Sequence, residues 1–199
     1  MTQQVLPNLL TPLTADQAAK ALSDGYKKVV GQKPPKKILS LLVSQTALET
    51  GNWKSLHNFN FGNAKATGSD PFIQYYGCSE VLNGTEQFFQ AGDPHCVFAA
   101  HKTAADGAAH YVNVLKSREH WWQGLQSGSV PKFISGLTTA PAYFTANAIT
   151  YGNTLNKLAI QYAPLAKKYA SSTILQVLGG LAAGAVAVVG YRETKKRLG

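Results

Sequence analysis

The sequence predicts an α+β fold, in which a mainly helical domain carries a small antiparallel β-hairpin sheet and is followed by a C-terminal transmembrane helix. Three observations lead to this prediction. Apolar residues recur at helical spacing in the first 50 residues and again after residue 103. Between residues 72 and 100 the chain is instead rich in aromatic and β-branched side chains around an Asn-Gly pair. Residues 174–189 contain no charged side chain.

The first predicted helix covers about residues 14–31. Thr14 and Gln17 have the spacing of a capping box, in which each side chain satisfies a backbone N–H of the other residue. Four apolar side chains then recur at helical spacing: Ala18, Leu22, Tyr26 and Val29. Gly31 is a typical residue for the end of such a helix.

The second predicted helix covers about residues 36–50 and has apolar residues spread widely around its axis, which is typical of a central, buried helix. Its last turn contains Glu49, the only acidic residue between Asp24 and Asp70. A carboxylate is unfavourable at this end, because the C-terminal end of a helix dipole is negative. Both the dipole and burial are expected to raise the pKa of Glu49. The residue is therefore either a solvated acid at a helix end or a functional group.

The middle of the chain changes period and predicts short antiparallel strands over about 72–82, 85–90 and 95–100. The pair Asn83-Gly84 is a strong hairpin signal. Helical spacing returns at 103–122, where Thr103 and Asp106 resemble a capping pair. Further helices are predicted at about 130–137 and 147–168. This order places the sheet to one side of the helices.

The C-terminal segment predicts a membrane-spanning helix. Residues 173–191 approach the length of roughly 20 residues that crosses a bilayer. Four basic residues follow, as is typical of the flank of a span: Arg192, Lys195, Lys196 and Arg197. Gly180 and Gly184 have the small-xxx-small spacing that allows self-association in lipid. The alternative is a Gly/Ala-rich helix that docks on the domain.

Composition restricts the partners. The chain has 19 Lys and Arg residues against 10 Asp and Glu residues, for a net charge of +9. This charge favours an anionic partner such as nucleic acid, anionic lipid or an anionic cell-wall polymer. We expect no nucleic acid, because no basic stripe interleaved with aromatic residues occurs in the body of the chain. We also expect no metal and no cofactor, because the five histidines lack ligand spacing and the chain lacks a phosphate-binding Gly-rich motif.

Two cysteines, Cys78 and Cys96, fit neither a zinc pattern nor a disulfide-dense scaffold. They could form a disulfide if the domain reaches an oxidising space. The alternative is two half-buried thiols.

One segment carries a resemblance to a known family. The helix end ALETGNW (residues 47–53), the loop NFNFGNAKA (58–66) and the aromatic hairpin after them resemble lysozyme-like cell-wall glycosidases. The resemblance is closest to the glucosaminidases of glycoside hydrolase family 73, of the flagellar and autolysin type, and extends to lytic transglycosylases. The family has Ala-Leu-Glu-Ser-Gly-Trp-Gly at the helix end, so Thr50 replaces a serine here and Asn52 is inserted. In the family's next motif, Asn-Leu-Phe-Gly-Val-Lys-Ala, Asn63 is an extra residue.

Later pieces extend the resemblance over about residues 14–165. VFAAHKTAADGAAHYVNVL resembles a strand followed by a capped helix, although Ala99 and His101 replace the family's Arg and Tyr. PAYFTANAITYGNTLNKL resembles another helix entrance of the family, with Tyr143 and Tyr151 as the matching aromatic residues.

The resemblance implies a lysozyme-like fold and cleavage of the β-1,4 glycosidic bonds of peptidoglycan. It implies that Glu49 is the general acid. For the second carboxylate, Glu80 fits the family's placement shortly before the hairpin turn, and Glu86 and Asp93 are the alternatives. A lytic transglycosylase would need only Glu49, because a hydroxyl of the substrate closes a 1,6-anhydro ring.

The resemblance also suggests which residues contact the substrate. They lie in the loop and among the aromatic residues: Asn60, Phe61, Asn63, Lys65, Tyr75, Tyr143 and Tyr151. The two asparagines could instead cap the backbone of their own loop. Tyr75 could equally pack in the hairpin.

We therefore expect three parts: an N-terminal extension (1–13), a lysozyme-like catalytic domain (14–169) and a transmembrane helix with a basic tail (170–199). The N-terminus does not resemble a secretory signal. A virion protein of a membrane-containing bacteriophage would reconcile this with a wall substrate, and a tail-anchored cellular or lysis-phase enzyme in the bacterial cytoplasmic membrane is the alternative. A non-catalytic wall-binding or structural membrane protein is the alternative from another functional class.

Overall fold

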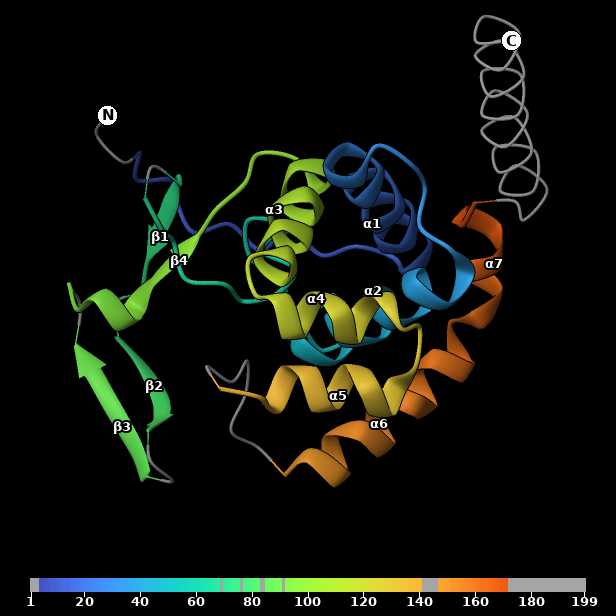
Figure 1. The fold of residues 1–199 in the computed structure, drawn as a ribbon. Coiled ribbons are helices and arrows are strands. Elements are labelled where there is room, and N and C mark those ends of the chain that lie inside the picture. Colours follow the sequence, from blue (N-terminus) through green and yellow to red (C-terminus); the bar gives the residue numbers. More distant parts are fainter. Residues whose placement is uncertain are drawn as a thin grey trace, which may run out of the picture.

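The computed structural model describes residues 4–171 except for 69, 76, 83–84, 91 and 141–146, and it leaves out the side chains of 80–82. Helices form one body and short strands lie beside it, on the left in Figure 1. This arrangement confirms the predicted α+β fold with the strands to one side.

The helices follow the predicted order, and two predicted helices are each divided. The described residues contain these: α1 Ala15–Val30, α2 Lys36–Glu49, α3 Ala104–Lys116, α4 Glu119–Gln126, α5 Val130–Thr138, α6 Ala148–Gln161 and α7 Ala163–Tyr169. The predicted helix over 103–122 is divided at Ser117 and Arg118, and the one over 147–168 at Tyr162. Pro164 explains the second break, because proline is favoured in the first turn of a helix and disfavoured inside one.

The predicted helix ends are confirmed. Thr14 and Gln17 form both hydrogen bonds of the capping box at the start of α1. Gly31 ends α1 with a left-handed backbone, at φ 88°. The Thr103 hydroxyl accepts a hydrogen bond from the backbone N–H of Asp106 at the start of α3.

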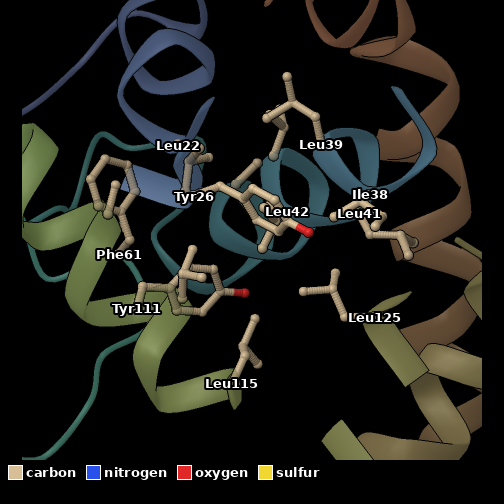
Figure 2. Close-up of a cluster of buried hydrophobic side chains, with 14 of the residues drawn as sticks. Leu22, Tyr26, Ile38, Leu39, Leu41, Leu42, Phe61, Tyr111, Leu115 and Leu125 are labelled. Atoms are coloured by element: carbon tan, nitrogen blue, oxygen red, sulfur yellow. The ribbon is translucent and has the colours of Figure 1, made fainter. Parts of the chain in front are cut away.

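Helix α2 lies at the centre of the core, as the spread of apolar residues around its axis predicted. Figure 2 shows side chains of α2 between those of α1, α3 and α4. Leu39, Leu42 and Val43 of α2 have no exposed surface. Packing on several faces fixes both ends of α2, and with them the position of Glu49.

The strands form two sheets of two strands each, where a single sheet was expected. β1 (Phe72–Gln74) pairs with β4 (Val97–Ala99), and β2 (Gly77–Leu82) pairs with β3 (Thr85–Gln90), both antiparallel. The predicted strand over 72–82 is therefore divided after Gln74. Before this point the chain pairs with β4, and after it the chain pairs with β3. The pairing of Leu82 with Thr85 confirms the hairpin, while its predicted turn residues lie outside the described residues.

The described part of the predicted N-terminal extension, residues 4–13, lies along the domain. Phe72 of β1 pairs with it, donating to the Gln4 carbonyl (3.0 Å) and accepting from the Leu6 N–H (2.8 Å). The Asn58 N–H donates to the Leu9 carbonyl (2.9 Å). This segment therefore supports the loop that follows α2.

Among the described residues, no helix combines the length and apolar character needed to cross a membrane. The predicted membrane-spanning residues 173–191 lie outside the described part of the chain, which ends at residue 171.

Candidate active site

Glu49 is the last residue of α2, and its carboxyl group is largely shielded from water. Burial raises the pKa of Glu49, as the sequence predicted, and a hydrogen bond from Tyr151 partly opposes this shift. The Tyr151 hydroxyl donates to Glu49 Oε1 over 2.7 Å. No basic residue lies in the last turn of α2 to stabilise the charged form. Glu49 is thus placed to hold a proton at a higher pH than an ordinary glutamate and to release it to an acceptor.

The chain turns sharply after Glu49 because three consecutive residues adopt left-handed backbone: Gly51, Asn52 and Trp53, at φ 56°, 56° and 61°. Glycine and asparagine tolerate this conformation, whereas tryptophan does so at some cost. Burial offsets this cost for Trp53, since only 1% of the residue is exposed. Its indole N–H donates to the Thr46 hydroxyl (3.2 Å). The buried indole therefore fastens the turn to the last turns of α2.

Two asparagines organise the loop beyond this turn. The Asn60 side chain accepts from the Ala64 N–H and donates to the Ala64 carbonyl, both over 2.9 Å. Asn60 thus caps its own loop, which is the alternative that the sequence left open. Asn63, at φ 47°, donates through Nδ2 to the backbone carbonyl of Glu49 (2.9 Å). Asn63 therefore joins the loop directly to the end of α2.

A pocket of about 350 Å³ lies between this loop and the strands. His57, Asn60 and Asn63 line it from the loop, and Tyr75, Cys78 and Phe98 line it from the strands. Asn63 connects the pocket to Glu49, because it both lines the pocket and bonds to the Glu49 carbonyl. A pocket with amide groups and aromatic faces suits a polar ligand that also has apolar faces, as sugars do.

Lys65 and Tyr75 both contact Phe98, a residue of β4 that lines the pocket. The Lys65 ammonium lies 3.7 Å from the centroid of the Phe98 ring and donates to the His95 carbonyl. Tyr75 packs edge-on against Phe98, with ring centroids 5.3 Å apart. Tyr75 thus packs in the hairpin region and also lines the pocket, while its contact with substrate stays a prediction.

Phe61 requires a correction. It was expected to contact substrate, but it has no exposed surface and lies in the helical core. An aromatic residue in a loop can either contact a sugar or pack in the core. Here burial of the whole Phe61 ring stabilises the loop. Tyr143, another expected contact, lies outside the described residues.

The candidates for the second carboxylate lie on or near the β2–β3 hairpin. Glu80 belongs to β2 and pairs in register with Gln87, but its side chain is not among those described. Glu86 is exposed on β3. Asp93 caps the short helix Pro94–Cys96 and accepts hydrogen bonds from the backbone and ring of His95, which lower the pKa of Asp93. Asp93 is thus already engaged by His95.

The structure settles the alternative for the cysteines, because Cys78 and Cys96 form a disulfide with their Cα atoms 5.6 Å apart. The disulfide links β2 to the segment just before β4. It therefore joins the two small sheets beside the pocket.

Removing this disulfide by changing both cysteines to alanine is expected to lower the free energy of unfolding by about 2 kcal/mol, because the bond closes a short loop that the unfolded chain would otherwise leave open. Urea unfolding of the wild type and of the double variant measures the difference. A reductant should lower the stability of the wild type to that of the variant and leave the variant unchanged. Equal stability of the two proteins under oxidising conditions would contradict the prediction.

Sequence reasoning missed several site residues. His57, Ile73 and Phe98 line the pocket, yet no motif marks them. The contact between Tyr151 and Glu49 joins residues 102 positions apart, so no local pattern could reveal it. In the described part of the chain, no group of three or more His, Cys, Asp or Glu side chains is placed to hold a metal ion.

Comparison with protein-family models and with curated proteins finds no match. Several solved structures nevertheless have a similar fold. They include a peptidoglycan hydrolase mutant from Sphingomonas sp. A1, with a TM-score of 0.51 and 19% identity over 73% of this chain and 85% of that one. The catalytic domain of the autolysin Auto from Listeria monocytogenes has a TM-score of 0.51 and 18% identity over 81% and 90% of the two chains. The glycoside hydrolase domain of Salmonella typhimurium FlgJ has a TM-score of 0.51 and 16% identity over 86% and 99%. The chain therefore shares its fold with these hydrolase domains.

Proposed function

We propose that this protein cleaves β-1,4 glycosidic bonds in bacterial peptidoglycan, with Glu49 as the general acid. The observation that carries the proposal is the shielded Glu49 carboxyl group, whose pKa is raised by burial. The backbone carbonyl of Glu49 also accepts a hydrogen bond from Asn63, which lines a pocket of amides and aromatic rings. The likeness in fold to peptidoglycan hydrolases supports the choice of substrate. The net charge of +9 would favour approach to an anionic wall.

In the proposed reaction Glu49 donates its proton to the oxygen of the glycosidic bond. The bond between that oxygen and the anomeric carbon then breaks, and its electron pair stays on the oxygen of the leaving sugar. A raised pKa keeps Glu49 protonated to a higher pH than an ordinary glutamate, which favours the role of a general acid. Tyr151 holds the carboxyl group in place through its 2.7 Å hydrogen bond.

The attacking group distinguishes two versions of the enzyme. In a hydrolase of the glucosaminidase or muramidase type, a second carboxylate activates water or stabilises the oxocarbenium-like sugar ring of the transition state. Glu80 is our candidate for this carboxylate. In a lytic transglycosylase, the substrate's own hydroxyl attacks and Glu49 serves as sole acid and base. We favour the hydrolase because the hairpin places Glu80 in β2, the strand that also supplies Cys78 to the pocket.

Replacing Glu80 by glutamine is therefore expected to lower the rate of cleavage by about 100-fold, because the second carboxylate is lost. Mass spectrometry of the products should show reducing ends for the wild type. Glu86→Gln, on the neighbouring strand, is the matched comparison and should retain activity. Products with 1,6-anhydro ends, formed equally well by Glu80→Gln, would instead assign the lytic transglycosylase reaction.

Changing Tyr151 to phenylalanine is expected to shift the alkaline limb of the pH–rate profile to higher pH. The Tyr151 hydrogen bond favours the charged carboxylate, so its loss raises the pKa of Glu49 further and keeps the acid protonated longer. The maximal rate should fall about tenfold, because a hydrogen bond to a charged group is worth about 1.5 kcal/mol. Tyr162→Phe is the control, since that hydroxyl donates to Asn52 Oδ1 (2.8 Å). A Tyr151→Phe profile that is unchanged or moves to lower pH would contradict this role.

The alternative from another functional class is a non-catalytic wall-binding or structural membrane protein with the same fold. Zymography on peptidoglycan distinguishes the two. The wild type should clear the gel and Glu49→Gln should not. Binding to the wall without clearing by either protein would favour the non-catalytic alternative.

We further propose that residues 173–191 anchor the enzyme in a lipid bilayer, on the basis of their apolar sequence and basic flank. We propose that this bilayer is the virion membrane of a bacteriophage, where the enzyme would open the wall for passage of the phage. Gly180 and Gly184 would permit self-association there. Carbonate extraction of purified virions tests the anchor, because release of the enzyme without detergent would contradict it.

A further inference from the structure

A basic surface lies around the start of α2 and the end of α7. We call it the basal surface and define it by four exposed lysines: Lys33, Lys36, Lys37 and Lys167. The connection between α1 and α2 meets the end of α7 here, because the Ser171 N–H donates to the Pro34 carbonyl (2.9 Å). Figure 1 shows this connection and the end of α7 on the same side of the molecule. Ser171 is the last described residue, so the surface adjoins the point where the chain continues toward the predicted membrane segment.

The positive charge of the basal surface is not neutralised within the described part of the protein. Neighbouring lysines have partners there: Lys28 binds Asp106 (2.8 Å) and Lys168 binds Asp16 (2.7 Å). By contrast, the four lysines of the basal surface form no ion pair with a described residue.

The start of α2 adds to this positive charge. Lys36 and Lys37 occupy its first turn, where the helix dipole is already positive, and the first turn contains no acidic residue. The N-cap, Pro35, provides no side-chain hydrogen bond. A first turn with two lysines and no cap is locally unfavourable, so an anion from outside the protein would be stabilised at this place.

We propose that the basal surface docks on the anionic headgroups of the bilayer that holds the predicted transmembrane segment. This inference rests on the proposed membrane anchor. Only Ser172 separates Ser171 from residue 173, the first residue of that segment. The four lysines thus lie close to the place where the chain would enter the bilayer, within the short distance over which a charged membrane surface attracts basic groups. A wall polymer or a nucleic acid would have no reason to be met at this particular place.

Docking in this way would orient the active site. Helix α2 has Lys36 at one end and Glu49 at the other. Its 14 residues span about 20 Å at a rise of roughly 1.5 Å per residue. With the lysine end on the headgroups, Glu49 points away from the bilayer and toward the wall.

Lysine acetylation followed by mass spectrometry tests the proposal on the full chain. The protein is mixed with vesicles of phosphatidylcholine alone or with 30% phosphatidylglycerol (roughly the share that gives a marked negative surface potential), and bound protein is isolated by flotation. We expect acetylation of the basal lysines to be at least about threefold slower on the anionic vesicles, with the protection removed by roughly 1 M salt. Lys54, just beyond Glu49, is the internal control and should react equally on both kinds of vesicle.

Two triple variants make the test specific. Lys33→Gln/Lys36→Gln/Lys37→Gln removes three of the four basal charges, and Lys54→Gln/Lys102→Gln/Lys116→Gln removes the same amount of charge elsewhere. Flotation with both lipids, combined with equal acetylation rates of the basal lysines on neutral and anionic vesicles, would support the anchor and overturn the docking surface. Flotation only with anionic lipid, lost in the first variant and kept in the second, would contradict the anchor and support the surface. Flotation with neither lipid would overturn both the anchor and the docking surface. Protection of the basal lysines by a soluble polyanion would then assign them to a wall polymer.

Discussion

Replacing Glu49 by glutamine is expected to lower the rate of peptidoglycan cleavage by about 10²–10⁴-fold, the contribution of a positioned general acid. Glutamine has nearly the same size but has no acidic proton to give to the glycosidic oxygen. The fold should persist, because the neutral side chain can still accept the Tyr151 hydrogen bond. Initial rates of clearing of a suspension of purified cell walls measure the effect.

The matched control is Glu119→Gln, which makes the same chemical change at an exposed position on α4. Its rate should equal that of the wild type. The melting temperature of Glu49→Gln at neutral pH should be no lower than that of the wild type, because a partly buried carboxylate is costly to ionise and the substitution removes that cost. A Glu49→Gln protein that retains more than about a tenth of the activity would contradict the assignment.

Replacing Gly107 by alanine is expected to lower the free energy of unfolding by more than about 3 kcal/mol. A Cβ atom at this position of α3 would lie 1.9 Å from the carbonyl oxygen of Phe59, far inside van der Waals contact. Phe59 belongs to the loop that carries Asn63, and that backbone cannot rotate aside as a flexible side chain can. The variant should also lose activity, because displacement of the loop breaks the bond from Asn63 to the Glu49 carbonyl.

Gly152→Ala, in α6, is the matched control for this prediction. A Cβ atom there would meet the Ile134 side chain at 3.6 Å, an ordinary contact. Because alanine favours a helix over glycine, the control should be more stable than the wild type by about 0.5–1 kcal/mol. Urea unfolding of the three proteins measures both values. A Gly107→Ala protein within about 1 kcal/mol of the wild type would contradict the close approach of α3 to the loop.

The sequence predicted the features that depend on neighbouring residues. The capping box of Thr14 and Gln17, the left-handed end at Gly31 and the burial of α2 all follow from short-range patterns. The raised pKa of Glu49 was also predictable, because its position at the end of a buried helix is visible in the sequence.

Features that depend on distant parts of the chain were not predictable. The division of the strands into two sheets arises because β1 takes β4 as its partner across 22 intervening positions or more, which periodicity does not encode. The contacts of Glu49 with Tyr151 and Asn63 likewise join separate segments. Phe61 shows the same limit, since an aromatic residue in a loop is compatible with either a sugar contact or burial in the core.

The most direct test of the central claim is the chemical analysis of purified peptidoglycan after digestion. Mass spectrometry identifies the new ends, and the wild type should produce new sugar ends while leaving the peptide stems intact. Glu49→Gln should produce almost none, and Glu119→Gln should match the wild type. New sugar ends formed equally by the wild type and Glu49→Gln, or new peptide ends alone, would contradict glycosidic cleavage with Glu49 as the acid.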